Sequence, residues 1–269
     1  MGTKNSANET KGDGTGRESA EFMATPRPVL VKSAEHPPGE IIGFHDHPRS
    51  QLLYAAHGVM TVKTDRDIWV VPPSRAVWIP AGIPHQTIVS THLSMRSLYI
   101  TPEFCNGAPD TCCVISVSPL LRELILEAVT FPRLYPLNGP EERVMAVILD
   151  QLRRMDITSV NVPIPRDPRL KTIFLGLDEN PGDRLTLEEW GKAVGATRRT
   201  LTRLFLSETA MTFGQWRQQI RLLKALPRLA AGEPVTIVAL EMGYETPSAF
   251  ISMFRKALGK PPGKYFSAP

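Results

Sequence analysis

Short apolar segments dominate the chain between residues 28 and 118. Segments such as 51–56 and 68–71 are separated by Pro, Gly and Asp, and residues 59–64 run into Asp65-Arg66-Asp67 as a hairpin arm runs into its turn. Runs this short, bounded by turn residues, are typical of β-strands. Their close spacing predicts a small β-barrel or jelly roll, which would form the first half of an α+β protein.

The period of the apolar positions changes at Pro119. Apolar residues then recur at helical spacing in two stretches, at positions 120, 121, 124, 125 and 128 and at positions 144, 147, 148 and 152. This pattern predicts an antiparallel pair of helices over residues 119–157, which we expect to join two chains into a homodimer. Pro163, Pro165 and Pro168 then exclude a helix, so we interpret residues 158–168 as a semi-rigid linker.

Residues 169–269 show helical patterns alone and contain two helix-turn-helix motifs. In the first, a helix over 187–194 is followed by Gly195 and by a second helix that Thr197 can cap. In the second, a helix over 235–240 is followed by Gly243 and by a helix that Thr246 can cap. Glycine accepts the positive φ that ends a helix, and a threonine hydroxyl bonds the free amides that begin one. Two such motifs in tandem are suited to placing two recognition helices in the major groove of DNA.

A long helix is predicted between the two motifs, over residues 213–230. Its apolar and basic faces are formed by Trp216, Ile220 and Leu223 and by Arg217, Arg221 and Lys224, respectively. Pro227 is unexpected in such a helix because it lacks an amide N–H. We expect it to kink or end the helix near Leu223.

The outward faces of the second helices carry the candidate DNA-reading residues. These are Arg198, Arg199, Thr202 and Arg203 in the first motif, and Pro247, Ser248, Ala249 and Ser252 in the second. An arginine can bond guanine through two atoms, whereas small residues contact thymine methyl groups or let the backbone approach. Sequence discrimination is therefore expected mainly from the first of these helices.

Charge and composition agree with this division. Residues 1–165 hold 15 basic and 17 acidic residues, whereas residues 166–269 hold 16 and 10, so the positive excess lies in the half predicted to bind DNA. Residues 1–27 are polar and predict a disordered tail. The tail lacks the apolar segment of a signal peptide, and the chain has no run of apolar residues long enough for a membrane helix. We therefore expect a soluble, cytoplasmic protein without a membrane partner.

The two motifs resemble the AraC/XylS family of bacterial transcription regulators. The resemblance covers about residues 170–266, including the ending 254–265, and the coincidence of turns, caps and aromatic spacing makes it specific. It implies base contacts at Arg199, Thr202 and Arg203 and at the four outward residues of the second motif. It also implies promoter DNA as a partner, and regulation, usually activation, through contact with RNA polymerase.

Four residues of the N-terminal half have the spacing of the two cupin motifs: His45, His47, Gln51 and His85, with glutamine where an acid is usual. This half thus resembles a cupin barrel, which is also the commonest sensor domain of the regulator family. On a strand, His45 and His47 point to the same side, where His85 could join them. Three imidazoles and an amide could bind a divalent transition metal, since neutral imidazole suits Fe, Ni, Zn and Cu.

The alternative is that the same four residues form hydrogen bonds to a small organic effector. The apolar walls of its pocket would then be Tyr54, Met60, Trp69 and Trp78. We favour this interpretation over the metal, because Gln51 brings no negative charge to offset that of the ion.

Two functions from different classes compete. The leading hypothesis is a transcription regulator that responds to a small molecule or metal bound in the barrel. The alternative is a metal-dependent cupin enzyme such as an oxygenase. The two-histidine, one-carboxylate triad of such enzymes would need an acid at the position of Gln51, which favours the regulator.

Overall fold

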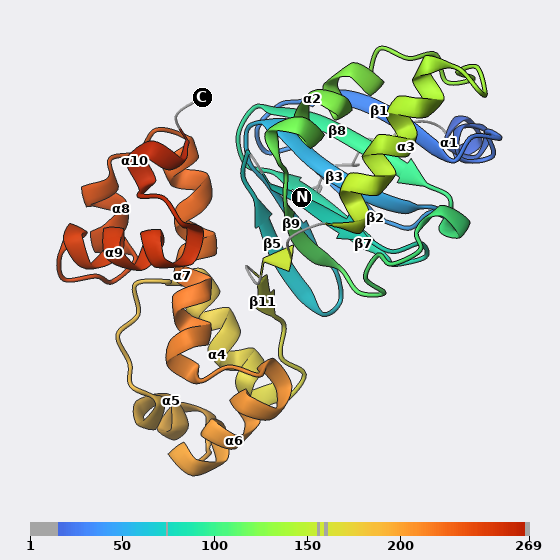
Figure 1. The fold of residues 1–269 in the computed structure, drawn as a ribbon. Helices are drawn as coiled ribbons and strands as arrows, with labels where there is room; N and C mark the ends of the chain where they lie inside the picture. The colour runs from blue at the N-terminus through green and yellow to red at the C-terminus, as the bar shows by residue number, and fades with distance from the viewer. Residues whose placement is uncertain (1–15, 74, 155–156, 159–160, 267–269) are drawn as a thin grey trace, which may run out of the picture.

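The N-terminal half contains two antiparallel β-sheets that face each other, and the C-terminal half is helical (Figure 1). The structure is a computed structural model that describes residues 16–73, 75–154, 157–158 and 161–266. One sheet has the strand order β1-β8-β3-β6-β9-β10, with β10 at Ile157–Thr158, and the other the order β11-β5-β4-β7-β2, with β11 at Asn161–Pro163. The strands of the barrel are β1 (Val29–His36), β2 (Ile41–His45), β3 (Ser50–His57), β4 (Met60–Lys63), β5 (Asp67–Val71), β6 (Arg75–Ile79), β7 (His85–Val89), β8 (Leu93–Ile100) and β9 (Cys113–Ser116), with a short 3-10 turn, η1 (Pro102–Phe104), after β8. The predicted α+β class and N-terminal barrel are confirmed.

Successive residues of each strand lie on opposite faces of the sheets, as the period of a β-strand requires. Leu53 of β3, Val62 of β4 and Val77 of β6 belong to one buried apolar cluster, which fills the space between the sheets. Leu52 and Tyr54, the two residues adjacent to Leu53, belong to a second cluster on the outer face of the six-stranded sheet. That sheet therefore has a separate apolar layer on each side.

The outer layer is covered by α2 (Pro119–Ala128) and α3 (Pro140–Arg153), which pack against each other. Leu121 and Ile125 of α2 and Ile148 of α3 are buried in this layer. Figure 1 shows both helices along the side of the barrel that contains β1, β8 and β3. The predicted helical pair is confirmed, and its role in dimerisation stays a prediction.

The predicted disordered tail is wrong in part. Residues 16–23 form α1 (Gly16–Met23), while residues 1–15 lie outside the described residues. The segment after α1 is fixed because the buried guanidinium of Arg49 donates hydrogen bonds to the carbonyl oxygens of Met23, Thr25 and Arg27 at 2.7–2.9 Å. Bonds from a distant arginine to backbone carbonyls leave no trace in the hydrophobic pattern of the segment itself.

The segment 158–168 is also more than a linker. Ile157–Thr158 form β10 beside β9, and Asn161–Pro163 form β11 at the edge of the second sheet, paired with β5. An edge strand leaves one side of its backbone unpaired, so it tolerates proline. The prolines correctly exclude a helix here, but they do not exclude an edge strand.

Seven helices form the C-terminal half within the described residues. They are α4 (Pro168–Glu179), α5 (Leu187–Val194), α6 (Arg198–Thr209), α7 (Phe213–Ala230), α8 (Val235–Glu241), α9 (Pro247–Leu258) and α10 (Pro262–Tyr265). The long helix α7 has the predicted bounds and runs between the two helix-turn-helix units (Figure 1). None of the helices in the described ranges is long and apolar enough to cross a membrane.

Pro227 was expected to kink or end α7 near Leu223. It does not end the helix, which continues to Ala230, and the kink stays a prediction. The side chains of Leu226 and Leu229, on either side of the proline, are both buried in the core of the helical half. Proline removes one backbone hydrogen bond from a helix, and apolar burial on this scale can offset that loss.

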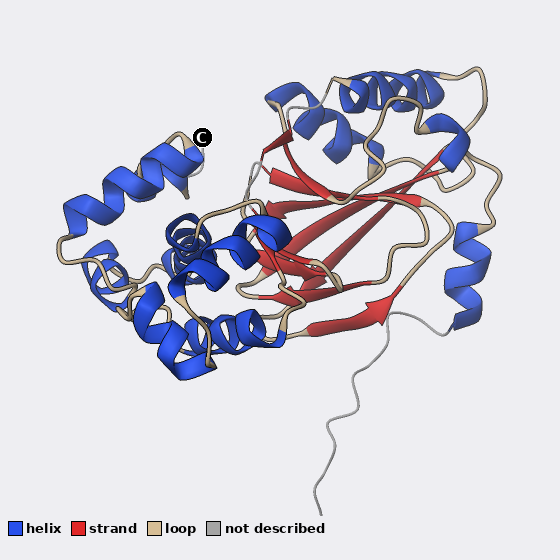
Figure 2. Ribbon diagram, turned by 90° about the horizontal axis from the view of Figure 1, so that it is seen from below, coloured by secondary structure: helices blue, strands red, loops and turns tan. Residues whose placement is uncertain are grey.

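The two halves pack directly against each other. Val70 of β5 and Val162 of β11 lie in the same buried cluster as Trp216 of α7, and the Trp216 indole N–H donates to the carbonyl oxygen of Pro163 at 3.1 Å. The backbone amides of residues 166 and 167 donate to the carboxylate of Glu208 on α6. Figure 2 shows the strands lying between this helical half and the helices of the other side. The segment that joins the halves is thus bonded to both.

Candidate DNA interface and sensor site

The first helix-turn-helix unit is formed by α5 and α6. Thr186 and Glu189 make a capping box at the start of α5, in which the side chain of each accepts a hydrogen bond from the backbone amide of the other. Gly195 ends α5 with a φ of 67°, and the hydroxyl of Thr197 begins α6 by accepting from the amide of Thr200. The caps and the turn predicted for this unit are confirmed.

The second unit is formed by α8 and α9. Gly243 has a φ of 76°, which favours glycine, and a Cβ at this position would lie only 2.6 Å from the carbonyl oxygen of Gly182. Both the backbone conformation and the available space therefore require glycine here. The hydroxyl of Thr246 accepts from the amide of Ala249, and Pro247 takes the first helical position, where no N–H is needed. This turn and this cap are confirmed as well.

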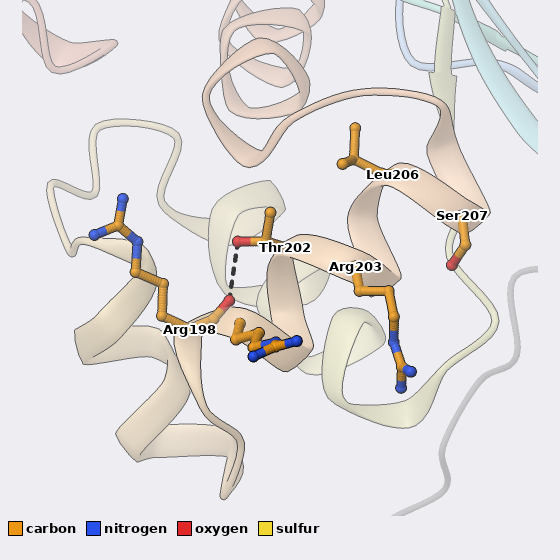
Figure 3. A pocket seen from close by; sticks show the side chains of 6 residues that line it. Arg198, Thr202, Arg203, Leu206 and Ser207 are labelled. Atoms are coloured by element: carbon orange, nitrogen blue, oxygen red, sulfur yellow. Dashed lines mark hydrogen bonds between the residues drawn. The ribbon is translucent and has the colours of Figure 1, made fainter.

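The predicted residues of α6 share one exposed face. They line a surface hollow, shown in Figure 3, that is formed by Arg198, Arg199, Thr202, Arg203, Leu206 and Ser207. Within the described part of the chain, the three arginine side chains have no acidic or hydrogen-bonding partner. The Thr202 hydroxyl donates to the carbonyl oxygen of Arg198 at 2.9 Å, which leaves the oxygen of Thr202 as an acceptor. This face can therefore take up the acceptors of DNA bases and phosphates.

Leu206 is a member of this face that the sequence analysis missed. It is 49% exposed, although leucine is usually buried in a helix of this kind. Its spacing of four residues from Thr202, and of eight from Arg198, places it on the same helical stripe. That spacing is visible in the sequence, but the apolar side chain of Leu206 gave no sign that it faces outward.

The corresponding face of α9 carries small side chains. The predicted residues all reach the surface, with Pro247 half-buried and the others exposed: Ser248, Ala249 and Ser252. The basic residues of α9 come only in its last turn, at Arg255 and Lys256. The first turns of α9 therefore offer hydroxyls and methyl groups, but no positive charge.

The basic face of α7 is used within the protein. Arg221 donates to the carbonyl oxygens of Pro181 and Asp183 at 2.9 and 2.8 Å, and Lys224 pairs with Asp178 at 2.6 Å. These bonds fasten α7 to α4 and to the loop before α5. The predicted basic stripe of α7 is therefore structural, whereas the arginines of α6 have no such partner among the described residues.

The three predicted histidines of the barrel converge. His45, at the end of β2, is the register partner of His85, at the start of β7. The ring centroids of His45 and His85 are 4.4 Å apart, and those of His47 and His85 are 5.2 Å apart. One ring nitrogen of each histidine lies within 4.8 Å of the other two. The convergence predicted from the cupin-like spacing is confirmed, and the occupant of the site stays a prediction.

Backbone carbonyl groups orient all three rings. Each Nδ1 atom lies 2.5–2.9 Å from a carbonyl oxygen two residues away in the chain: Gly43 for His45, Arg49 for His47 and Ile83 for His85. A carbonyl oxygen only accepts, so each Nδ1 carries the proton and each Nε2 keeps its lone pair. Burial lowers the pKa of His47 and lowers that of His85 to about 4, so both rings are neutral at pH 7.

Gln51 joins the cluster through His47. Its amide oxygen lies 3.1 Å from His47 Nε2, and its amide nitrogen lies 3.1 Å from the hydroxyl oxygens of Ser97 and Tyr99. Neutral His47 carries its one proton on Nδ1, which donates to the Arg49 carbonyl oxygen, so its Nε2 atom can only accept. All three neighbours are satisfied if the Gln51 NH2 group faces His47 and the amide oxygen accepts from both hydroxyls, because the two ends of an amide are nearly isosteric.

The four predicted wall residues divide between the two faces of the barrel. Met60 and Trp69 belong to the cluster inside it. Tyr54 and Trp78 belong to the outer cluster under α2 and α3, where the Trp78 indole donates to a backbone carbonyl. The strand period puts Tyr54 on the face opposite to Leu53, so the structure removes Tyr54 and Trp78 from the wall of an internal pocket.

Comparisons with known proteins match both halves of the chain. Residues 27–143 match the family described as AraC-like ligand binding domain, and residues 190–268 match one described as helix-turn-helix domain. The HTH-type transcriptional regulator NimR of Escherichia coli K12 is 36% identical over 226 residues, which cover 83% of this chain and 81% of NimR. The HTH-type transcriptional activator RhaR of Mannheimia succiniciproducens is 27% identical over 262 residues, covering 91% and 94%. The regulatory protein SoxS of Salmonella typhimurium is 29% identical over 97 residues, covering 36% and 91%.

Proposed function

This chain belongs to the AraC family of transcription regulators, and on that premise we propose how its two halves divide the work. It is a DNA-binding regulator with a ligand-binding domain, and not an enzyme. We propose that α6 reads promoter DNA in the cytoplasm through Arg199, Thr202 and Arg203, and that α9 adds weaker contacts. We also propose that the histidine cluster of the barrel is the sensor site.

The observation that carries the DNA-reading proposal is the exposed face of α6. Its arginines are free of acidic partners in the described part of the chain, whereas Arg221 and Arg228 bond within the protein. Arg198 is the first residue of α6, and we propose that it contacts phosphate as the helix enters the groove. Arg199 and Arg203 lie one turn apart and would contact base edges.

The test is selection of binding sites from random DNA. The wild-type protein should enrich one recurring sequence, and Arg203→Ala should lose the preference at one base position while keeping it elsewhere. An unchanged sequence preference in Arg203→Ala would contradict the assignment. Mapping of bound sites across the genome, with and without candidate effectors, would then identify the regulated promoters.

For the sensor site we propose a divalent transition-metal ion held by His45, His47 and His85. The three Nε2 lone pairs are the donors, and the hydrogen bond from each Nδ1 to a carbonyl oxygen is the arrangement that fixes a metal-binding histidine. Gln51 would supply a fourth, neutral ligand if its amide oxygen turned toward the ion. Neutral imidazoles suit iron, nickel, zinc or copper better than calcium or magnesium.

Metal analysis of the purified protein tests this site. The wild type should retain close to one equivalent of metal and His85→Ala should lose it, while His92→Ala, at an exposed histidine outside the cluster, should retain it. A wild type that carries no metal and gains no thermal stability from added Fe, Ni, Zn or Mn would refute the proposal.

An organic effector is the second candidate for the same site. The network of Gln51, Ser97 and Tyr99 supports it, because hydroxyls and an amide beside the apolar Met60 and Trp69 suit a small polar molecule. In that case His85→Ala should abolish the promoter response to the effector and leave effector-free DNA affinity unchanged. The metal content of the purified protein therefore distinguishes the metal from the organic effector.

We further propose that α2 and α3 join two chains and that the dimer activates transcription by contacting RNA polymerase. Leu120 of α2 is 54% exposed and Val147 of α3 is 40% exposed, and apolar surface of this kind suits a partner. Leu120→Asp combined with Val147→Asp should yield a monomer in sedimentation and weaken binding to an operator with two half-sites. A dimer that persists in this variant would contradict the assignment of α2 and α3.

A further inference from the structure

The two helix-turn-helix units touch each other directly, beside α7. Gly182, in the loop between α4 and α5, lies so close to the end of α8 that a Cβ added to it would be 2.5 Å from the carbonyl oxygen of Glu241. A Cβ added to Gly243, in the turn of the second unit, would be 2.6 Å from the carbonyl oxygen of Gly182. The two backbones are thus in contact, and a side chain at Gly182 would push them apart because no free space remains.

Arg221 of α7 holds both sides of this contact. Its guanidinium donates to the carbonyl oxygens of Pro181 and Asp183 at 2.9 and 2.8 Å, on either side of the glycine in the loop. The same guanidinium lies 5.5 Å from the ring centroid of Tyr244, the residue after the glycine in the turn. A planar guanidinium can bond two carbonyls and cover an aromatic ring at once. We call Gly182, Arg221, Gly243 and Tyr244 the inter-unit clamp.

The inter-unit clamp is connected to the recognition helix of each unit. The ring of Tyr244 packs edge-on against the buried Phe250 of α9, with centroids 5.4 Å apart. In the first unit, Arg217 donates to the carbonyl oxygen of Leu185 at 3.0 Å, directly before the capping box that begins α5. Helix α5 packs in turn against α6. A change at the clamp would therefore alter the position of α9 relative to α6.

Helix α7 is the other connection between the units, and it lacks one backbone hydrogen bond. Pro227 has no amide N–H to donate to the carbonyl oxygen of Leu223, and this missing bond lies between Arg221 and the start of α8. Helices bend most easily where a backbone bond is lost. The contact between Gly182 and Gly243 bridges this point, because it joins the segments before and after it.

We propose that the inter-unit clamp fixes the number of base pairs between the DNA sub-sites that α6 and α9 contact, with Arg221 as the positioning residue. The inference rests on the proposed function, in which both helices contact DNA. Each added base pair moves the second sub-site by about 3.4 Å along the DNA axis and turns it by about 35° around that axis. Two helices held rigidly fit one such arrangement, whereas two hinged helices fit several. The contacts of α9 are small one by one, but the wrong spacing removes them together.

The test measures this spacing preference with the full-length protein. Sites selected from random DNA define the two sub-sites, and the base position that Arg203→Ala no longer prefers marks the one that α6 contacts. Three duplexes carry both sub-sites at the selected spacing, with one base pair added and with one removed. A fourth duplex keeps the α6 sub-site and scrambles the other. Fluorescence anisotropy gives the affinity of each protein for each duplex.

The variants are Arg221→Ala, Arg221→Lys, Gly182→Ala and a matched control, Lys224→Ala. Lys224 lies on the same basic face of α7, but it pairs with Asp178 of α4 and is not part of the inter-unit clamp. Gly182→Ala separates the units from the loop side and keeps the test valid should Arg221→Ala fail to fold. Circular dichroism shows which variants are folded.

The wild type should lose about tenfold in affinity when one base pair is added or removed, a loss similar to that of a base contact. Arg221→Ala and Gly182→Ala should bind the three spacings with nearly equal affinity, and both should match the wild type on the fourth duplex. Arg221→Lys should recover only part of the preference, because an ammonium cannot bond both carbonyls and cover the ring. Lys224→Ala should keep the full preference.

A wild type that selects the α6 sub-site but binds all three spacings equally would overturn the inference and leave the reading of DNA by α6 intact. A full spacing preference in folded Arg221→Ala and Gly182→Ala would also overturn it, since α7 alone would then set the spacing. A loss of affinity for the fourth duplex in Arg221→Ala would make that residue a structural support of the first unit, which is contrary to the inference. A wild type that selects no sequence would refute the proposed function and this inference with it.

Discussion

Helices α6 and α9 are built alike and present different surfaces. Each follows a glycine of positive φ, begins at a threonine that accepts from the third helical amide, and buries phenylalanine on its inner face, Phe205 in α6 and Phe250 and Phe254 in α9. The outer turns of α6 carry three free arginines, whereas those of α9 carry proline, serine and alanine. The scaffold and the reading surface are set by different residues, so the surface can change while the scaffold is kept.

The largest expected effect tests whether the two scaffolds are equal. Phe205 and Phe250 are both fully buried, so replacing either with alanine should lower the free energy of unfolding by about 3–5 kcal/mol. Urea unfolding followed by circular dichroism measures both variants. If one variant lost much less stability than the other, the two units would not be equivalent in their cores.

The second effect tests whether the surfaces differ as proposed. Arg203→Ala should cost ~1–3 kcal/mol of binding free energy on the selected operator and much less on random DNA, because a base contact is lost. Arg255→Ala, in the last turn of α9, is the control and should weaken both DNAs to a similar, smaller extent. Fluorescence anisotropy titrations give both affinities. A loss of equal size on both DNAs in Arg203→Ala would reassign that arginine to a phosphate.

The third effect returns to the shared scaffold. Thr197→Ala and Thr246→Ala each remove one cap, and each should lower the free energy of unfolding by ~1 kcal/mol. Replacement by serine, which keeps the hydroxyl, should restore most of the loss. Thermal unfolding of the four variants measures this, and a serine variant as unstable as its alanine counterpart would argue against capping by the hydroxyl.

The smallest effect concerns the outer face of α9. Ser252→Ala removes one neutral hydroxyl and should change the binding free energy on the selected operator by less than about 1 kcal/mol. A loss as large as that of Arg203→Ala, in the same anisotropy titration, would show that α9 discriminates bases as strongly as α6 does.

The sequence predicted the features of this fold that depend on local chemistry. Gly195 and Gly243, with the threonines that follow them, mark both turns because few residues accept that backbone or supply that cap. The cupin-like spacing likewise predicted the convergence of His45, His47 and His85, although His47 lies just after the end of β2 and not on a strand as expected.

Features that depend on distant contacts could not be read in the same way. The order at α1 depends on bonds from Arg49, and the position of β11 depends on its pairing with β5. The wall assignment failed for Tyr54 and Trp78 because a strand buried on both faces has no polar side to reveal which face points inward. A cavity between the halves is lined by residues of both, so no single segment of the sequence predicts it.

Strand β11 has a consequence for how this protein can be recombined with its relatives. Val162 contributes to the core of the helical half while its strand extends the sheet of the barrel. A chimera joined at residue 166, the obvious break in the sequence, would strip the helical half of Val162 and of the Pro163 carbonyl that Trp216 bonds. A graft that begins at Asn161 keeps both and needs an acceptor barrel whose edge strand matches β5. The helical half can therefore be exchanged only together with β11, and only onto a barrel whose β5 can pair with that strand.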